Sequence, residues 1–268
     1  MRAKWLIPLL MVGILSCKKS EEATQPPPVR EDVYVMALSL LGVGDDSLIH
    51  SFHYGIIDGV PYGEFPNIWI RGLRVPTDSM EWEDWGLIFY MSDYPVLSPG
   101  DSCDMRFRIP TIEGDTVETH AAVRMLDTLS MRISVDSSRL YISWNNIPDS
   151  RDYLAMIDAS CNLIDSVYYR DTTVFTRDTF LVFERSWLCP DDTVGVLLYI
   201  SLVAAGSPWI GEPGNFTGIP GRYIPMSFDF EDIYIRPDSV IVNRVNPERN
   251  RLMEILRLIN HRVAGGKS

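Results

Sequence analysis

The chain has 268 residues, with 24 Lys and Arg against 36 Asp and Glu, which gives a formal net charge of −12. This acidic balance argues against sequence-independent binding of nucleic acid, because such binding depends on Lys and Arg that neutralise phosphates. The length suits one large domain or two small ones, and a hydrophobic fraction of 46% supports a packed core.

The first 16 residues have the pattern of a secretory signal. Arg2 and Lys4 precede a short apolar run that ends at Ser16. A basic region, a short apolar region and a small residue before the cut define such a signal, and this run falls short of the about 20 residues that span a bilayer. Removal of residues 1–16 leaves 22 basic and 36 acidic side chains, a charge of −14.

The end of this signal carries a second feature, because Ile14-Leu15-Ser16 stands directly before Cys17. This segment resembles the lipobox of bacterial lipoproteins, in which the Cys thiol receives a diacylglycerol and becomes the mature N-terminus. The resemblance implies a covalent lipid on Cys17 and attachment to a membrane of the bacterial cell envelope, most naturally the outer membrane, on its surface or its periplasmic face. The alternatives are an ordinary cleaved signal with a chance cysteine, or an uncleaved N-terminal anchor.

Residues 17–31 form the lipidated cysteine and a tether. The tether is polar and contains Pro26, Pro27 and Pro28, so it cannot bury enough surface to fold and is typical of a semi-rigid spacer of about 3 Å per residue. Ser20-Glu21-Glu22 also resembles the acidic export tags of surface-exposed lipoproteins of the Bacteroidota. A plain solvated tether is the alternative.

From Asp32 the pattern changes to short runs of β-branched and aromatic residues between turn signals. Such runs at regular spacing predict an all-β sandwich over residues 32–127. Its layout resembles the immunoglobulin- or transthyretin-like modules of bacterial surface lipoproteins. The predicted strands cover residues 33–40, 48–57, 67–75, 86–91, 104–109 and 117–126.

A second sandwich is predicted over residues 128–236. Residues 140–144, which end in Trp144, and residues 153–158 resemble strands B and C of a fibronectin type III domain. Residues 179–183 and 194–204 resemble its strands E and F, although Val194 stands where the family has a tyrosine. Modules of this family are scaffolds without shared catalytic residues, so the resemblance implies architecture more than activity.

This strand map brings Cys161 and Cys189 to one pole of the second sandwich and implies a disulfide between them. Two small buried thiols are the alternative. Cys103 is then the leftover thiol of the mature chain.

Two aromatic groups are candidates for ligand binding. Residues 206–221 form a loop rich in Gly and Pro that contains Trp209 and Phe216. Loops on a rigid sandwich often carry recognition, and exposed rings can stack on sugars or fill a partner's pocket. Alternatively, both rings fold back and cap the sandwich. Trp82 and Trp85 lie among acidic residues and are the second pair expected to be exposed.

Residues 237–268 are predicted to contain a strand at 240–245 and an amphipathic helix that starts at Pro247. The helix has an apolar stripe and a basic opposite side. Three destinations remain open for the stripe, namely the protein's own sandwich, another protein or an anionic membrane surface. The stripe consists of Leu252, Ile255, Leu256, Ile259 and Val263.

Catalytic and metal-binding patterns are missing from the sequence. It contains no nucleophile elbow, zincin pair, phosphate loop or dinucleotide fingerprint, so we predict no enzyme and no cofactor besides the lipid. Calcium at the acidic loops 45–46, 191–192 or 229–232 is an alternative. Repeated Asp-Ser/Thr pairs fit turn formation, and they also resemble acceptor sites for O-glycosylation.

These observations predict an all-β protein of two immunoglobulin-like or fibronectin type III-like sandwiches in tandem, followed by a short C-terminal helix. The functional hypothesis is a lipid-anchored, non-catalytic module of the cell envelope that binds glycan or protein. The first alternative is a structural subunit of an envelope assembly, joined through the C-terminal helix. The second alternative is a hydrolase accessory.

Overall fold

The computed structural model describes residues 30–92, 97–208, 214–236, 239–245 and 248–265, and these residues are predominantly in β-strands. The described strands form a nine-stranded sheet, which we call the main sheet, and two small sheets. The main sheet consists of β1 (Tyr34–Val43), β2 (Ile49–Asp58), β5 (Met80–Glu83), β6 (Gly86–Ser92), β11 (Ser150–Asn162), β12 (Val167–Thr176), β14 (Val196–Gly206), β15 (Gly221–Ile235) and β16 (Val240–Arg244).

The small sheets and the helices complete the described chain. One small sheet contains β3 (Asn67–Ile70), β4 (Leu73–Arg74), β7 (Ser102–Pro110) and β8 (Thr116–Arg124), and the other contains β9 (Met131–Val135), β10 (Arg139–Trp144) and β13 (Phe180–Glu184). The helices are η1 (Thr77–Ser79), α1 (Arg185–Leu188) and α2 (Arg249–Gly265). The predicted all-β fold with a short C-terminal helix is therefore confirmed.

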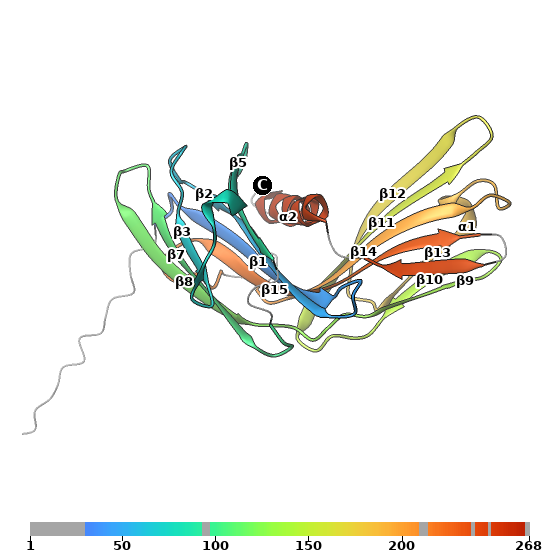
Figure 1. Cartoon of the computed structure of the whole chain (residues 1–268), viewed down its shortest axis with the longest axis horizontal. Helices are drawn as coiled ribbons and strands as arrows, with labels where there is room; N and C mark the ends of the chain where they lie inside the picture. The colour runs from blue at the N-terminus through green and yellow to red at the C-terminus, as the bar shows by residue number, and fades with distance from the viewer. Residues whose placement is uncertain (1–29, 93–96, 209–213, 237–238, 246–247, 266–268) are drawn as a thin grey trace, which may run out of the picture.

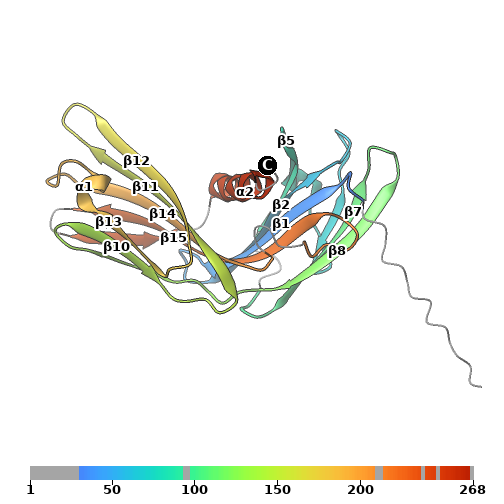
Figure 2. The same ribbon diagram turned by 180° about the vertical axis from the view of Figure 1, so that it is seen from behind.

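Each small sheet packs on one half of the main sheet and forms a sandwich with its own core. We call the half with β1, β2, β5 and β6 and the sheet β4-β3-β7-β8 the proximal arm. The half with β11, β12 and β14 and the sheet β13-β10-β9 is the distal arm. The curved main sheet has the small sheets on its outer side and α2 in its hollow (Figures 1 and 2).

Strand β15 belongs to both arms. Its first part pairs in parallel with β1, from Val35 opposite Gly221 to Gly42 opposite Phe228. Its later part pairs antiparallel with β14, as far as Ile235 opposite Val196. The two predicted sandwiches are thus joined by one continuous sheet, and the boundary that we expected at residues 127 and 128 separates only the small sheets.

The predicted strand map of the distal arm agrees with the observed pairing. Strands β10 and β13, expected as B and E, are neighbours with Leu140 opposite Phe183. Strands β11 and β14, expected as C and F, are neighbours with Ile157 opposite Ile200. The structure also joins Cys161, at the end of β11, to Cys189, just after α1, in the disulfide that the resemblance implied.

Helix α2 lies on the hollow side of the main sheet with its apolar stripe against the protein's own core. Leu252, Ile255, Leu256 and Ile259 are fully buried there against side chains of β1, β2 and β15. Each such burial contributes about 1.5–3 kcal/mol. Docking on the protein's own sandwich, the first of the three expected destinations, is therefore found for these four side chains, which are not exposed for the connector role that the envelope-assembly alternative requires. The side chain of Val263, the fifth member of the predicted stripe, lies outside the described residues.

Charged flanks of α2 contact both arms. Towards the proximal arm, Arg249 pairs with Glu81 at 2.6 Å and Arg257 pairs with Glu83 at 3.4 Å, both on β5. Towards the distal arm, Arg251 pairs with Asp158 of β11. Within the described part of the chain, no helix is long and apolar enough to cross a membrane.

The connection between the two small sheets is held by polar side chains of β15. The backbone N–H of Leu129 donates to Ser227 Oγ at 2.7 Å, and that of Met131 donates to Asp229 Oδ2 at 2.6 Å. Glu231 follows on the same side of the strand and is 6% exposed. Its burial, together with the charge of Asp229, raises the pKa of Glu231 to about 7, although Arg244 opposes the shift.

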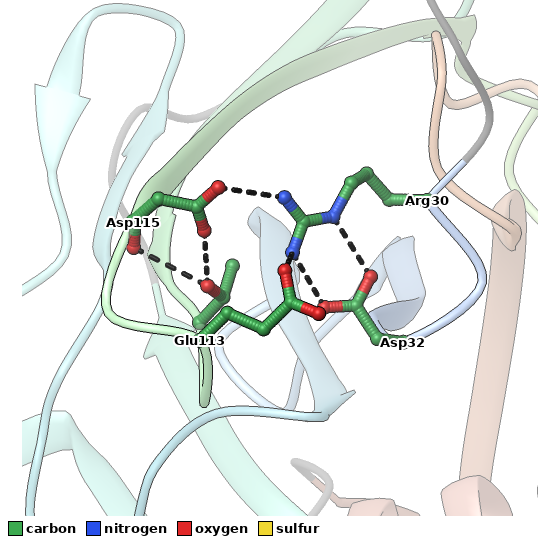
Figure 3. A network of polar contacts seen from close by, with 5 residues as sticks. Arg30, Asp32, Glu113 and Asp115 are labelled. Carbon is green, nitrogen blue, oxygen red and sulfur yellow. Dashed lines mark hydrogen bonds and ion pairs between the residues drawn. The ribbon is translucent and has the colours of Figure 1, made fainter.

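The described chain begins at a cluster of charges on the turn between β7 and β8. Arg30 donates to Asp32, to Asp115 at 2.8 Å and to Glu113 at 3.2 Å (Figure 3). The backbone N–H of Arg30 also donates to the carbonyl of Gly218 at 3.1 Å. Arg30, the first described residue, therefore lies at one end of the proximal arm.

We predict that Glu231→Gln raises the free energy of unfolding at pH 8 by up to about 3 kcal/mol. The folded state holds the extra proton between pH 4.5 and about 7. The stability contributed by protonated Glu231 is therefore complete below pH 4.5 and is lost as pH rises through 7. Urea unfolding at pH 5 and pH 8 measures this difference. A variant whose stability falls with pH as steeply as the parent's would contradict the assignment.

Candidate functional site

The hollow side of the distal arm carries an exposed row of apolar side chains that runs across the strands. The row consists of Tyr169 on β12, Leu197 on β14, Tyr234 on β15 and Ile241 on β16, which we call the apolar row. These four side chains are 59%, 53%, 38% and 42% exposed. A contiguous exposed apolar patch is typical of an interaction site, whereas single exposed apolar residues are common everywhere.

Strand register aligns these side chains across the sheet, with Ser160 between Tyr169 and Leu197. Ser160 of β11 is opposite both Tyr169 and Leu197. Leu197 is in turn opposite Tyr234, which is opposite Ile241. Because side chains alternate along a strand, Val196 and Leu198 point into the distal core while Leu197 points into the hollow. Helix α2 covers the inner part of this face, and the apolar row lies in the part that it leaves open.

A groove lies between the apolar row and α2. It has a volume of about 420 Å³ and carries carboxylates and tyrosines around a single arginine. Its lining consists of Asp158, Tyr169, Tyr199, Asp232, Glu248, Asn250, Arg251 and Glu254.

The arginine of the groove, Arg251, already has hydrogen-bond partners within the protein. The guanidinium of Arg251 donates to Ser201 Oγ at 2.8 Å and to Glu254 Oε2 at 2.7 Å, and it also donates to Asp158 Oδ2. It lies over the ring of Tyr199, 5.0 Å from the centroid. Burial raises the pKa of Asp232, and the charge of Glu248 raises it further. The groove therefore offers carboxylate oxygens beside exposed apolar side chains, a combination suited to a cationic partner with an apolar side.

The structure changes the expected role of the long loop. Trp209 lies outside the described residues. Phe216 was a candidate ligand-binding ring, with folding back onto the sandwich as the alternative, and the structure has this alternative, because Phe216 is 6% exposed in the proximal core. Its ring centroid is 5.4 Å from that of Phe107 and 6.0 Å from that of Tyr223. The ring folds back because burial against these neighbours is more favourable than exposure to water.

Trp82 and Trp85 are both partly buried, so the expectation of two exposed rings is also wrong. Trp82 packs against the proximal core, 5.3 Å from the ring of Tyr62. Trp85 packs against the hydrophobic core beneath α2, and Arg257 lies over its ring at 5.7 Å from the centroid. These contacts belong to strand β5 and the turn after it, an element that the predicted strands omitted.

The acidic loops bond to their own turns. Asp46 accepts from the backbone N–H of Leu48, and Asp191 accepts from that of Thr193. Among the residues that the structure describes, no three His, Cys, Asp or Glu side chains gather as metal ligands. Asp229 instead binds the backbone of Met131 and pairs with Arg244.

One cluster of potentially reactive groups is sealed inside the proximal sandwich. Ser39 Oγ lies 2.7 Å from His53 Nδ1 and 2.9 Å from the hydroxyl of Tyr223, which donates to Cys103 Sγ at 2.8 Å. All four residues are completely buried. Burial lowers the pKa of His53 to about 3 and raises that of the Cys103 thiol. Because the side chains are neutral and cut off from solvent, they serve packing and hydrogen bonding.

Comparisons with known proteins support no functional conclusion. Neither a scan against protein-family models nor a search of curated proteins finds a match. A crystal structure of the FN1–FN3 domains of chicken CNTN1 is similar over 83% of this chain and 66% of that one. The sequence identity is 12% and the TM-score is 0.28, so we base no functional conclusion on it.

Proposed function

We propose that this chain is an exported, lipid-anchored and non-catalytic protein of a bacterial envelope that binds a partner protein through the apolar row. The exposed row of Tyr169, Leu197, Tyr234 and Ile241 on a rigid sheet carries the binding part of this proposal. The signal-like residues 1–16 and the lipobox-like segment before Cys17 support the anchor.

The protein's own helix indicates the chemistry of the partner. Helix α2 is amphipathic and basic, and it binds the inner part of this face by burying Leu256 and pairing Arg251 with Asp158. The open part next to it repeats this chemistry, with the apolar row beside Asp171 and Asp232. A second basic amphipathic segment, supplied by another protein, would match it in the same way.

The dimensions of the row agree with such a segment. Neighbouring strands lie about 4.8 Å apart, so the four steps from β12 to β16 span about 19 Å. A helix of about 13 residues has this length. Tyrosine rings beside carboxylates also suit a glycan, but Leu197 and Ile241 have no ring on which a sugar can stack, and this favours a protein.

The binding proposal is tested with two matched double variants. Leu197→Ser with Ile241→Ser removes aliphatic surface from the apolar row, while Phe180→Ser with Val182→Ser removes similarly exposed surface from β13. A partner is identified by crosslinking in intact envelopes, and its affinity is then measured by titration. We expect the row variant to weaken binding at least tenfold, about 1.4 kcal/mol, and the β13 variant to leave it within about twofold.

Equal affinities of the parent and the row variant would contradict a role for this face. An oligosaccharide that competes with the protein partner would show that the row binds glycan, and this would contradict the choice of a protein partner. All three proteins should show the same thermal unfolding, since the four substituted side chains are exposed.

The anchor is tested separately by metabolic labelling with a palmitate analogue. Lipid is expected on Cys17, so Cys17→Ala should lose the label while the Cys103→Ala control keeps it. Labelling of the Cys17→Ala variant at the level of the parent would refute the anchor. Burying two or more acyl chains makes attachment stable, so the unlabelled variant should also leave the membrane fraction.

A further inference from the structure

The outer face of the sheet β4-β3-β7-β8 is basic, although the whole protein is acidic. It presents five arginines and two carboxylates, a net charge of +3 in a chain of net charge −12. We call this surface the arginine face. It consists of Arg71, Arg74, Arg106, Arg108 and Arg124 with Asp104 and Glu118, all of them exposed.

Strand alternation produces this face. Along β7, Met105, Phe107 and Ile109 are buried in the proximal core, while Arg106 and Arg108 point outward. Register then groups the arginines across strands, because β8 and β3 are both neighbours of β7. The face is therefore a product of the sandwich and not of one charged segment.

A tryptophan lies at the centre of the arginine face. Trp69 is opposite Arg106 on one side and Arg74 on the other, and it is partly exposed. Together with Arg106, Arg108, Asp104 and Glu118 it lines a shallow hollow of about 350 Å³, in which Arg108 pairs with Glu118 at 3.5 Å. An amphipathic indole between cationic side chains is the composition found where proteins meet the headgroup region of a membrane.

The start of the described chain lies beside this face. Arg30 is held on the β7–β8 turn by Glu113 and Asp115 (Figure 3). On the same hairpin, Arg108 opposite Glu118 lies two residue pairs from Pro110 opposite Thr116, where the paired strands end. Residues 18–29 can extend at most about 40 Å, so a lipid on Cys17 would keep this end of the protein near the bilayer.

We propose that the arginine face binds the anionic phospholipid headgroups of the membrane that holds the anchor. This proposal rests on the lipid anchor of the proposed function. The Debye length is about 8 Å at physiological ionic strength, so headgroup phosphates interact mainly with the charges of the face that lies against the bilayer and little with the rest of the acidic protein. The proposal commits to a lipid surface because the face is basic and because Arg30, the first described residue, lies on the same hairpin as Arg108.

Orientation follows from this contact. The arginine face lies on the outer side of the proximal arm, whereas the apolar row lies on the hollow side of the distal arm (Figures 1 and 2). Membrane contact through the arginine face therefore leaves the apolar row uncovered. One acylated residue and one charged surface would hold the protein in a defined orientation, where a lipid alone would leave it free to turn.

The test measures vesicle binding by the mature chain from residue 17, made unlipidated by Cys17→Ser. The parent should sediment with vesicles of phosphatidylcholine mixed with phosphatidylglycerol and stay free of pure phosphatidylcholine. Each basic side chain contributes about a fivefold change in partitioning. Arg74→Gln, Arg106→Gln and Arg108→Gln together should therefore reduce binding by about a hundredfold, and salt should weaken binding by the parent.

A matched variant controls for total charge. Arg132→Gln, Arg139→Gln and Arg177→Gln remove three exposed arginines from the distal arm and should change binding by no more than about threefold. Equal losses in the two triple variants would overturn the proposal. So would absence of binding by the parent, equal binding to neutral vesicles, or binding to an anionic polysaccharide such as heparin without binding to vesicles.

The assay uses unlipidated protein, so its result does not depend on the proposed anchor. If Cys17 is not labelled, the anchor is refuted, and the vesicle measurement can still be interpreted by itself. Failed vesicle binding would refute the arginine face and leave both the anchor and the apolar row to their own tests. Because the three substituted residues of each set are exposed, thermal unfolding should match the parent in every variant.

Discussion

The shared strand β15 is the constraint on which the rest of the structure depends. Its backbone hydrogen bonds join β1 of the proximal arm to β14 of the distal arm, so neither sandwich has a complete main sheet without the other. The pairing with β1 joins Val35 to Gly221, residues far apart in the chain. Closing so long a loop costs entropy, which the buried central strands must offset. Both small sheets, the hollow and α2 take their positions from this continuous sheet.

Helix α2 divides the hollow face into a covered part and an open part. Its apolar stripe covers the centre of the main sheet. Without the helix, the side of β1 that faces the hollow would be exposed to water. Arg249 and Arg251 lie near the N-terminus of the helix, where the positive end of the helix dipole disfavours a cation. Their ion pairs with Glu81 and Asp158 offset this repulsion. The open part keeps the same apolar and acidic chemistry, and this is why we assign binding to it. The arginine face serves a different contact, on the opposite side of the proximal sandwich.

Local patterns predicted most strands and the helix, because alternation and apolar stripes are properties of short segments. Strand β5 escaped this reasoning, although Met80 and Trp82 face the core while Glu81 and Glu83 face α2. The pairing of β15 with β1 could not be predicted, because register between distant segments leaves no local signal. The apolar row also depends on register between strands and could not be predicted for the same reason. Tyr169 and Tyr234 look like ordinary strand residues, and only cross-strand register aligns both with Leu197.

The central claim is that both arms share one sheet and therefore fold as one unit. Differential scanning calorimetry of the mature chain, made unlipidated by Cys17→Ser, tests this directly. The structure predicts a single transition whose calorimetric enthalpy equals its van't Hoff enthalpy, because unfolding either arm removes a neighbour of β15. Two resolved transitions, each with the heat of one sandwich, would contradict it.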